Sequence, residues 1–460
     1  MLSERFDIAI VGAGVVGCAI ARRLTLDGAK VIVFEKALDV LDGASKGNSA
    51  ILHTGFDAPI GSLEQICVAR GYAEYLEIAN SLTLPILKSG AMVLAWNDEQ
   101  AERLPELVKK AHKNGVLDSA MLSKEDILMR EPHLSKSVVS GFEVPGEYII
   151  DPWSSAHAYL LQAMANGAQL CRGTEVLGGL FDSGEWTLKT SKTPINATHV
   201  INCAGLYGDV VDERLINKKS FTITPRKGQF VVFDKSSSAL TSSIILPVPT
   251  EKTKGVVICR TIFGNLLVGP TAEDQASRVD ASTDRESLQN LVAKGSEMIP
   301  GLADSEITAT YAGLRPASEF QDYQVNNWSE LNYVTVGGIR STGLSSALGI
   351  ARHVSELIDT KVYSGKPIVD PAIPKADRLS HYHSRDWEEV DNGGIVCHCE
   401  WVTRREIKRV MEGPIPPSSL EGLKRRTRVC MGRCQGFYCT AELAKITNGR
   451  FDLPLSIKHE

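Results

Sequence analysis

The 460-residue chain has no long hydrophobic run and no excess of basic charge. No apolar stretch approaches the ~20 residues that a membrane-spanning helix needs. The first apolar strand follows Met1–Arg5 directly, which is expected to leave no room for a signal peptide. A net charge of −5 argues against a general nucleic-acid binder. Internal repeats and low-complexity tracts are also missing, and the composition and length fit a soluble globular protein of about three domains.

Cysteine is sparse over most of the chain and concentrated near its end. Five of the ten cysteines are isolated, mostly in apolar runs: Cys18, Cys67, Cys171, Cys203 and Cys259. Such thiols are typical of small buried side chains in a reducing compartment, so we expect a cytoplasmic protein. The other five crowd together: Cys397, Cys399, Cys430, Cys434 and Cys439. This cluster calls for a separate explanation.

The N-terminal residues have the pattern of one βαβ unit. An apolar run, Phe6–Val11, leads into Gly12-x-Gly14-x-x-Gly17, a helical pattern and a second strand that ends at Glu35. In such a unit the first glycine makes a tight turn, the second admits a pyrophosphate, and the third lets the helix pack closely on the strands. The acid, about 20 residues further on, reaches ribose hydroxyls. By itself this pattern suits either NAD or FAD.

A loop of small and polar residues, 43–71, follows this unit and leads into a helical run through Ala79. With the glycines, Glu35 and the run Asn48–Gly55, the sequence resembles the FAD-dependent oxidoreductases of the D-amino-acid-oxidase-like superfamily. Within it, the closest resemblance is to the L-2-hydroxyglutarate and glycerol-3-phosphate dehydrogenase branch. The resemblance implies a Rossmann-type α/β FAD-binding domain interleaved with an α+β substrate domain built on an antiparallel sheet.

Later segments return to the expected flavin domain. Thr198–Gly205 has the pattern of a buried strand and glycine turn, residues 173–177 that of a strand, and Tyr333–Leu344 that of a strand, glycine turn and helix start. A helix N-terminus aimed at the flavin suits its anionic reduced ring. The residues that the resemblance places at FAD are Gly12, Ala13, Gly14, Gly17, Glu35, Lys36, Asn48, Ser49, Val176, Ala204, Gly205, Gly338, Arg340, Ser341, Thr342, Gly343 and Leu344.

These patterns divide the chain into alternating segments. Amphipathic helices are expected at 99–114 and 124–130, and alternating strands over 221–325. The stretch 363–394 is rich in proline and charge and is expected to form a linker or surface strap. The expected parts are flavin domain 1–79, 146–220 and 326–362, substrate domain 80–145 and 221–325, linker 363–394, and a small helical iron-sulfur domain, 395–460.

The clustered cysteines have the spacing C-x-C-x34-C-x4-C, with expected helices at 403–412 and 418–426 between the pairs. Four thiolates suit zinc or an iron-sulfur cluster. Zinc sites favour gaps of two to four residues in both pairs, so the single-residue gap counts against zinc. The spacing and the run Arg425–Cys439 resemble the 2Fe-2S module of the bacterioferritin-associated ferredoxin type. That module is fused to some anaerobic glycerol-3-phosphate, proline and opine dehydrogenase subunits.

One cysteine departs from this resemblance. Cys430 stands where many relatives carry a small non-ligand residue, so the second ligand pair stays open between Cys434 with Cys439 and a pair that includes Cys430. The basic run Lys424–Arg428 is commonly just a solvated helix face, yet beside a cluster its charges would stabilise the reduced state. The favoured metal ligands are Cys397, Cys399, Cys434 and Cys439.

Two side chains are the main candidates for substrate chemistry. His53 lies in the small-residue loop beside the flavin strand, and imidazole titrates near neutral pH, which suits a general base. Arg315 lies at the end of an expected strand of the sheet that covers the active site. In relatives, an arginine at this place binds a substrate carboxylate or phosphate. Either could instead be structural, as a loop histidine or a surface ion pair. The weaker candidates are Arg340, Arg260 and Lys227, whereas His157 and His398 are expected to be structural.

The leading hypothesis is a cytoplasmic FAD-dependent dehydrogenase that oxidises a small anionic secondary alcohol, of the glycerol-3-phosphate or 2-hydroxy-acid type. Hydride would go to flavin N5, and electrons would leave through the 2Fe-2S module to a quinone-linked partner subunit or a carrier protein. A hetero-oligomer held at the inner face of the membrane by a partner fits this scheme. Two alternatives remain: an amine or amino-acid dehydrogenase of the proline or opine type, and a non-catalytic electron-relay subunit.

Overall fold

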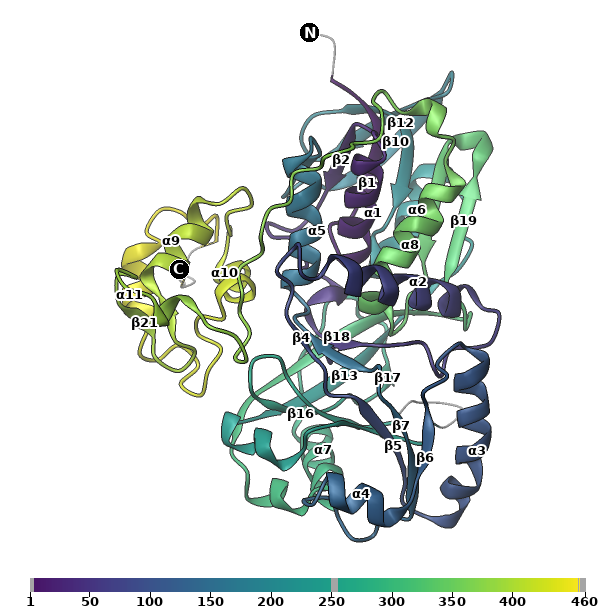
Figure 1. Cartoon of the computed structure of the whole chain (residues 1–460). Helices are drawn as coiled ribbons and strands as arrows, with labels where there is room; N and C mark the ends of the chain where they lie inside the picture. The colour runs from purple at the N-terminus through teal and green to yellow at the C-terminus, as the bar shows by residue number, and fades with distance from the viewer. Residues whose placement is uncertain (1–3, 250–254, 454, 456–460) are drawn as a thin grey trace.

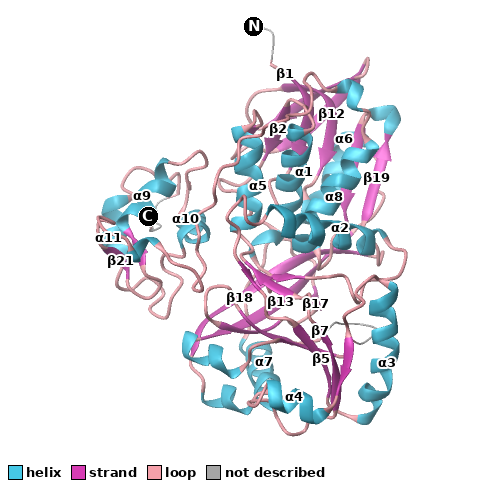
Figure 2. Ribbon diagram, viewed as in Figure 1, coloured by secondary structure: helices cyan, strands magenta, loops and turns pink. Residues whose placement is uncertain are grey.

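The computed structural model describes residues 4–249, 255–453 and 455. Parts of three expected segments therefore lie outside the described residues: 1–3, on which the signal-peptide expectation rests, 250–254 of the substrate domain, and 454 and 456–460 of the iron-sulfur domain. The chain forms two sheet-bearing parts and a small helical part beside them (Figure 1). Helices pack against both large sheets (Figure 2).

The first large sheet is the expected Rossmann-type sheet. It has eight strands, and its parallel strands follow a doubly wound order in which the first strand is central. Ile8 and Ile10 of the central strand pack into one hydrophobic cluster and Ala9 and Val11 into another, as expected for a parallel strand covered on both faces. The parallel order is β9 (Gln169–Cys171), β2 (Val31–Phe34), β1 (Arg5–Val11), β12 (Ile195–Asn202) and β20 (Tyr333–Gly337). The antiparallel additions are β10 (Val176–Asp182), β11 (Glu185–Thr190) and β19 (Gln324–Trp328).

Helices from four distant parts of the chain cover one face of this sheet. They are α1 (Val15–Leu26), α2 (Leu63–Ile78), α5 (Ser154–Ala165) and α8 (Gly343–Leu357), and α6 (Gly208–Ile216) packs on the other face. Gly71 of α2 and Gly349 of α8 allow these helices to touch, since a Cβ at Gly71 would lie 2.2 Å from the Ser345 carbonyl oxygen. The flavin-domain segments therefore form one core.

The second large sheet has nine strands and is antiparallel apart from the pair β5 and β14. Its two longest strands, β13 and β18, pair along almost their whole length. Helices α3 (Asp98–Lys113), α4 (Lys124–Arg130) and α7 (Arg285–Met298) belong to the same part. The strands are β5 (Ala91–Ala95), β6 (Ala120–Leu122), β7 (Ser140–Val144), β13 (Ile223–Phe233), β14 (Ile244–Pro247), β15 (Val257–Arg260), β16 (Leu266–Gly269), β17 (Glu273–Asp274) and β18 (Ile307–Ser318).

Three sequence expectations need correction. Helix α7 lies inside the segment 221–325, where the sequence pattern indicated strands; Asp284 caps it by accepting a hydrogen bond from the Ser287 N–H. The strand expected at 173–177 begins only at Val176, because Gly173 adopts a left-handed conformation, φ +57°, that breaks the chain direction. Strand β19 pairs with β20 and so extends the Rossmann sheet back to Gln324, across the expected boundary at 325.

A small sheet joins the two large parts, and a long segment connects them to the C-terminal module. The small sheet consists of β3 (Ile51–Leu52), β8 (Tyr148–Ile150) and β4 (Ile86–Leu87). Residues 363–394 form a strap along the surface, where backbone hydrogen bonds join Ile368 to Leu26 (2.9 Å), Ala376 to Leu82 (3.2 Å) and His381 to Ile262 (3.0 Å). The C-terminal module contains β21 (Ile395–Cys397), β22 (Val402–Thr403), α9 (Arg404–Glu412), α10 (Leu420–Thr427) and α11 (Thr440–Ile446).

None of the helices in the described parts of the chain combines the length and the apolar character that crossing a membrane requires.

Candidate functional site

The glycine turn after β1 is shaped by close backbone contacts. Gly12 adopts φ +109°, and a Cβ there would lie 2.5 Å from the Cys203 carbonyl oxygen. A Cβ at Gly17 would lie 2.0 Å from the Gly12 carbonyl oxygen, so only glycine lets α1 pack on this turn. Gly14 is the N-cap of α1 and provides no side-chain cap. The first N–H groups of the helix thus face a site suited to a pyrophosphate.

Glu35, at the end of β2, is tied to the same turn. Its Oε2 accepts a hydrogen bond from the Ala13 N–H and its Oε1 one from the Ala37 N–H, both at 2.9 Å. Burial raises the pKa of Glu35, and the two N–H donors oppose that rise. The neighbouring Lys36 ammonium lies 3.2 Å from the centre of the Tyr207 ring. Ala13, Glu35 and Lys36 therefore gather at one end of the predicted cofactor site.

We define residues 44–50 as the flavin loop. Ser45 Oγ accepts a hydrogen bond from the Val15 N–H at 3.0 Å, which places this hydroxyl at the N-terminus of α1. Asn48 braces the loop by donating to the Ser45 carbonyl oxygen (3.0 Å) and accepting from the Ala50 N–H (2.8 Å). Ser45 was not predicted from the sequence; the signal for it is a hydroxyl in a small-residue loop after the second strand.

Strand β18 of the nine-stranded sheet lies against this loop. A Cβ on Gly47 would be 2.8 Å from the Gly313 Cα of β18, so the two backbones touch. The Tyr311 hydroxyl donates to the Asn48 carbonyl oxygen at 2.7 Å, and the Cys259 thiol lies 3.9 Å from the Ser49 carbonyl oxygen. The predicted flavin residues Asn48 and Ser49 thus lie where the flavin domain meets the nine-stranded sheet.

The other predicted flavin residues lie at the ends of neighbouring strands. Val176 is buried at the start of β10, the Ala204 N–H donates to Asn202 Oδ1 at 3.0 Å, and Gly205 has φ +53° in the following turn. Because β1, β12 and β20 are parallel neighbours, their carboxyl ends share one edge of the sheet.

The turn between β20 and α8 reaches the same edge. Gly338 has φ +66°, and the Thr342 hydroxyl donates to Glu64 Oε1 at 2.7 Å and contacts the Tyr323 hydroxyl at 2.5 Å. Ser341 is exposed, Arg340 is half-buried, and Gly343 and Leu344 open α8, whose N-terminus has no side-chain cap. The N-terminus of α8, which has no side-chain cap, therefore opens at the carboxyl edge of the sheet that also carries the glycine turn after β1.

His53 is held by a buried glutamate that was not predicted from the sequence. Its Nδ1 lies 2.7 Å from Glu147 Oε2, and Glu147 is fully buried in the turn between β7 and β8. Glu147 Oε1 also accepts hydrogen bonds from the Thr54 N–H (2.6 Å) and hydroxyl (2.8 Å). A carboxylate in this role keeps the proton on Nδ1, which leaves Nε2 as an acceptor. No local signal could pair residues 94 positions apart.

Within the described parts of the chain, Arg315 donates only to backbone carbonyl oxygens, those of Thr271 (2.6 Å) and Arg226 (3.4 Å). Burial, with the charge of Arg226 alongside, lowers the pKa of Arg315 to about 10. The nearby Asp274 is occupied by a two-pronged pair with Arg226, at 2.6 and 3.0 Å. Among the described residues no ion pair neutralises Arg315, so its guanidinium suits an anionic ligand.

No hydrogen bond or ion pair in the described part of the chain joins His53 to Arg315. A groove of about 1680 Å³ runs along the nine-stranded sheet and is lined by Arg226 and Arg340, but by neither His53 nor Arg315. The weaker candidates have other positions: Arg260 donates to the Ser242 carbonyl oxygen (2.7 Å), and Lys227 lies opposite Leu314 in β18.

The clustered cysteines come together in two groups. Cys430 Sγ lies 3.4 Å from Cys439 Sγ, with Cys397 alongside, and Cys399 lies beside Cys434. Burial raises the pKa of Cys397 to about 11 and that of Cys439 to about 12. The backbone N–H of Tyr438 instead lowers the pKa of Cys434 by donating to its sulfur. N–H groups aimed at sulfur are a feature of iron-sulfur sites.

Among the described residues, no three His, Cys, Asp or Glu side chains are arranged to hold one metal ion. Two neighbouring groups of thiols are nevertheless the donor set of a binuclear cluster, in which each iron takes two protein ligands. The thiols therefore fit a 2Fe-2S cluster, with Cys430 as a fifth thiol beside Cys439. His398 is exposed between the first two cysteines, whereas His157 lies on α5 beside Arg425, Arg426 and Arg172.

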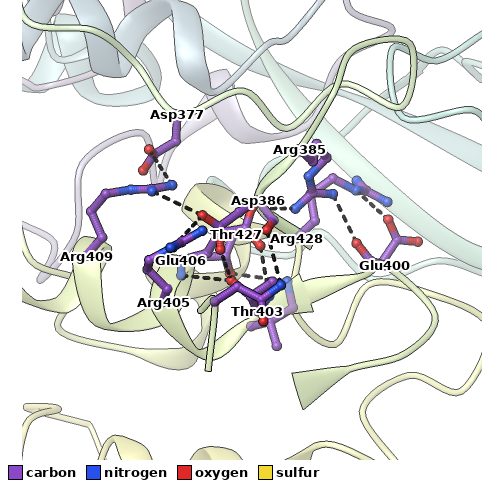
Figure 3. Close-up of polar contacts among 12 residues, drawn as sticks. Asp377, Arg385, Asp386, Glu400, Thr403, Arg405, Glu406, Arg409, Thr427 and Arg428 are labelled. Atoms are coloured by element: carbon purple, nitrogen blue, oxygen red, sulfur yellow. Dashed lines mark hydrogen bonds and ion pairs between the residues drawn. The ribbon is translucent and has the colours of Figure 1, made fainter. Parts of the chain in front are cut away.

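The strap is tied to the cysteine module by ion pairs (Figure 3). Arg409 pairs with Asp377 at 2.9 Å, Arg405 with Asp386 at 2.8 Å, and Arg385 with Glu406 at 2.9 Å. The Thr403 hydroxyl also donates to Asp386. Strap and module therefore form one folded unit.

The basic run of α10 is not a solvated helix face. Arg425, Arg426 and Arg428 are all buried. Arg426 pairs at 3.1 Å with Asp39, which is 2% exposed in the flavin domain, and Arg425 donates to the Val40 carbonyl oxygen at 3.3 Å. The simpler interpretation of this run is wrong, because these charges dock the module on the flavin domain.

Comparison with known proteins agrees with this architecture. Residues 7–357 match the family described as FAD dependent oxidoreductase, and residues 395–448 the BFD-like 2Fe-2S binding domain. The chain is similar to a glycerol 3-phosphate dehydrogenase of Caloramator mitchellensis, with 33% identity over 96% of this chain and 93% of that protein. It is also similar to one subunit of the anaerobic glycerol-3-phosphate dehydrogenase of Escherichia coli K12, with 22% identity over 99% of this chain and 90% of that protein.

Among solved structures, the fold matches dithionite-reduced L-alpha-glycerophosphate oxidase from Mycoplasma pneumoniae with FAD bound. The TM-score is 0.74, with 28% identity over 81% of this chain and 98% of that chain. The family, the fold class and both cofactors expected from the sequence, FAD and a 2Fe-2S cluster, are confirmed. The chain therefore belongs to the FAD-dependent oxidoreductase family and carries a BFD-like 2Fe-2S binding domain beyond its flavin-binding region.

Proposed function

We propose that the protein is a dehydrogenase that oxidises the secondary alcohol of a small anionic substrate, with glycerol 3-phosphate as the first candidate and 2-hydroxy acids as the second. The similar protein named glycerol 3-phosphate dehydrogenase spans both the flavin and the cysteine-bearing parts of this chain. The FAD-bound structure that it resembles carries a name for the same substrate class. Both similarities support an alcohol rather than an amine.

The observation that carries the proposal is the pair His53 and Glu147. Glu147 holds Nδ1 at 2.7 Å and, by keeping the proton there, leaves Nε2 free to accept the proton of a substrate hydroxyl. Its complete burial and its contacts with Thr54 fix the imidazole in one orientation. Bound FAD would supply the hydride acceptor.

Arg315 is proposed to hold the phosphate or carboxylate of the substrate. Its planar guanidinium can form two parallel hydrogen bonds to such a group. Burial and the nearby charge of Arg226 both disfavour the charged form of Arg315. An anion bound between the two guanidinium groups would be attracted by both and would offset their repulsion. The same cation would attract an amino acid carboxylate, so Arg315 does not by itself separate alcohols from amino acids.

The electrons would leave through the 2Fe-2S cluster, with Cys397, Cys399, Cys434 and Cys439 as its ligands. A quinone-linked partner subunit or a carrier protein would then accept them. The word "subunit" in the name of the Escherichia coli relative supports a hetero-oligomer. A cytoplasmic location, with attachment to the membrane through that partner, is part of the proposal.

The test is an anaerobic titration of the FAD-loaded protein with glycerol 3-phosphate, L-2-hydroxyglutarate and L-proline, following flavin bleaching. We expect glycerol 3-phosphate to bleach the flavin at the lowest concentration. Bleaching by the amino acid alone would show that the alcohol assignment is wrong. If no compound bleaches a flavin that dithionite can reduce, the chain is an electron-relay subunit instead.

The ligand set has its own test. Iron and acid-labile sulfide should be retained in Cys430→Ser and lost in Cys434→Ser. The two variants are matched, because both replace a thiol in the same loop of the module. Loss of iron in Cys430→Ser with retention in Cys434→Ser would move the second ligand pair to Cys430.

A further inference from the structure

The cysteine module docks in the angle between the flavin domain and the nine-stranded sheet (Figure 1). Arg426 fixes it to Asp39 of the flavin domain. On the other side, Arg433 pairs with Asp234 at 2.8 Å, and the Gln435 side chain donates to the Thr308 carbonyl oxygen at 3.1 Å. The contact thus fixes the cysteine loops, residues 397–400 and 428–439, against a defined surface of both domains.

Arg428 is part of this contact. It is buried, has φ +68° at the C-terminal cap of α10, and stands two residues before Cys430. Its Nε donates at 3.0 Å to Glu400, which follows Cys399 directly (Figure 3). Burial raises the pKa of Glu400, but the charges of Arg428 and Lys235 outweigh it and hold the pKa below its usual value.

An aromatic stack continues from Arg428 to the flavin loop. The Arg428 guanidinium lies 3.9 Å from the centre of the Phe263 ring. Phe263 in turn stacks on Trp153, with ring centres 5.4 Å apart and an interplanar angle of 15°. The Trp153 Nε1–H donates to the Lys46 carbonyl oxygen of the flavin loop at 3.2 Å. A continuous series of contacts therefore joins the cysteine loops to the flavin loop.

We propose that Trp153, Phe263 and Arg428 form the path by which electrons pass from the flavin to the 2Fe-2S cluster. Electrons tunnel more readily through atoms in van der Waals contact than through gaps, and this series is in contact from the flavin loop to Arg428, two residues before Cys430. Two contacts hold Trp153 in place: its ring stacks on Phe263, and its indole N–H donates to the backbone of the flavin loop.

The step balances in electrons and protons. Each transfer oxidises the reduced flavin by one electron and reduces the oxidised cluster by one, and the flavin proton goes to water. Two transfers follow each substrate oxidation, because the substrate delivers two electrons. An external electron acceptor, a quinone-linked or carrier protein, reoxidises the cluster between them. The inference rests on the proposed function only in taking the flavin as the electron source.

The experiment measures internal electron redistribution in the full-length protein with both cofactors bound and oxygen excluded. A light pulse with a one-electron photoreductant partly reduces the protein, and the absorbance of flavin and cluster is followed until their ratio is constant. No substrate is added, so an error in the assigned substrate would leave this measurement intact.

We expect Phe263→Leu and Trp153→Leu to slow the redistribution roughly tenfold or more, because each leaves a gap in the packed series. The ring-preserving variants Phe263→Tyr and Trp153→Phe should retain most of the rate. Phe142→Leu is the matched control, since Phe142 lies in the same hydrophobic cluster as Phe263 but outside the series. The final flavin-to-cluster ratio should not change in any of them, because the potentials are untouched.

Equal rates in Phe263→Leu, Trp153→Leu and the parent protein, with equal iron content, would overturn the proposal. Equal slowing in the ring-preserving and ring-removing variants would overturn it too, since a disturbed contact rather than a missing ring would then explain the loss. Limited proteolysis of the strap confirms that the module stays docked in each variant.

Discussion

At the scale of single residues, a small number of atoms fix the cofactor turn. The Cβ that Gly17→Ala adds would meet the Gly12 carbonyl oxygen at 2.0 Å, so α1 must move away from the turn. We expect the variant to be isolated with little or no FAD, measured as the ratio of flavin to protein absorbance. Gly43→Ala is the control, because nothing lies within 4 Å of the Cβ that it adds. Normal FAD content in both variants would contradict the prediction.

The second residue-scale prediction concerns Glu147. In Glu147→Gln the amide can donate to His53 Nδ1 and so leave the proton on Nε2, the wrong tautomer for a base. The turnover rate should fall by about 10²- to 10⁴-fold, the range that general-base catalysis contributes. FAD content should remain unchanged. Glu143→Gln, in β7 and paired with the exposed Arg130, is the matched control and should keep the parent rate. A parent-like rate in Glu147→Gln would show that the carboxylate does not orient a base.

At the scale of elements, α5 presents a histidine to three arginines. Burial, then Arg426, Arg425 and Arg172, lowers the pKa of His157 well below its usual value. The folded protein thus keeps His157 neutral, whereas the unfolded chain takes up a proton below about pH 6.5. The contribution of the neutral His157 to the free energy of unfolding is fully present above pH 6.5. It is lost as the pH falls below that value, by up to about 1.4 kcal/mol per pH unit. The free energy of unfolding, measured with denaturant at pH 7 and at pH 5, should decrease less between these two values in His157→Gln than in the parent protein. An equal decrease in both would contradict it.

Elements with local signals could be predicted from the sequence, and those set by distant contacts could not. Helix α4 starts at a capping box made by Ser123 and Asp126, and its predicted bounds, 124–130, agree with the structure. Helix α7 was missed because its surroundings alternate as strands do. Glu147 could not be assigned to His53, since only the fold brings the β7–β8 turn to residues 53 and 54. The buried role of Arg426 likewise depends on Asp39, 387 positions away.

At the scale of the whole molecule, charge helps to dock the module. Residues 395–460 contain twelve Lys and Arg against seven Asp and Glu, although the whole chain has a net charge of −5. Asp39 lies on the flavin-domain side of the contact, where it also accepts hydrogen bonds from the Ser419 hydroxyl (2.7 Å) and Arg172 (3.3 Å).

Asp39→Asn should therefore loosen the module, because it leaves the buried Arg426 without its counter-charge, a loss of about 3–5 kcal/mol. Trypsin should cleave the strap faster, and electron redistribution from flavin to cluster should slow. Asp42→Asn is the control, since Asp42 is half-exposed at the edge of the same contact. Identical cleavage rates in the parent and Asp39→Asn would show that this pair does not secure the module.

The strap has a consequence for reaction order. Because residues 363–394 are hydrogen-bonded along the surface and end in the module, the cluster reaches its docking place at an effective concentration on the order of millimolar or above. Transfer from the flavin is then a first-order event, whose rate is independent of how dilute the protein is. Only the encounter with the external acceptor depends on concentration. In a dilute cell extract the cluster would therefore take one electron from the flavin and stay reduced until it met the external acceptor.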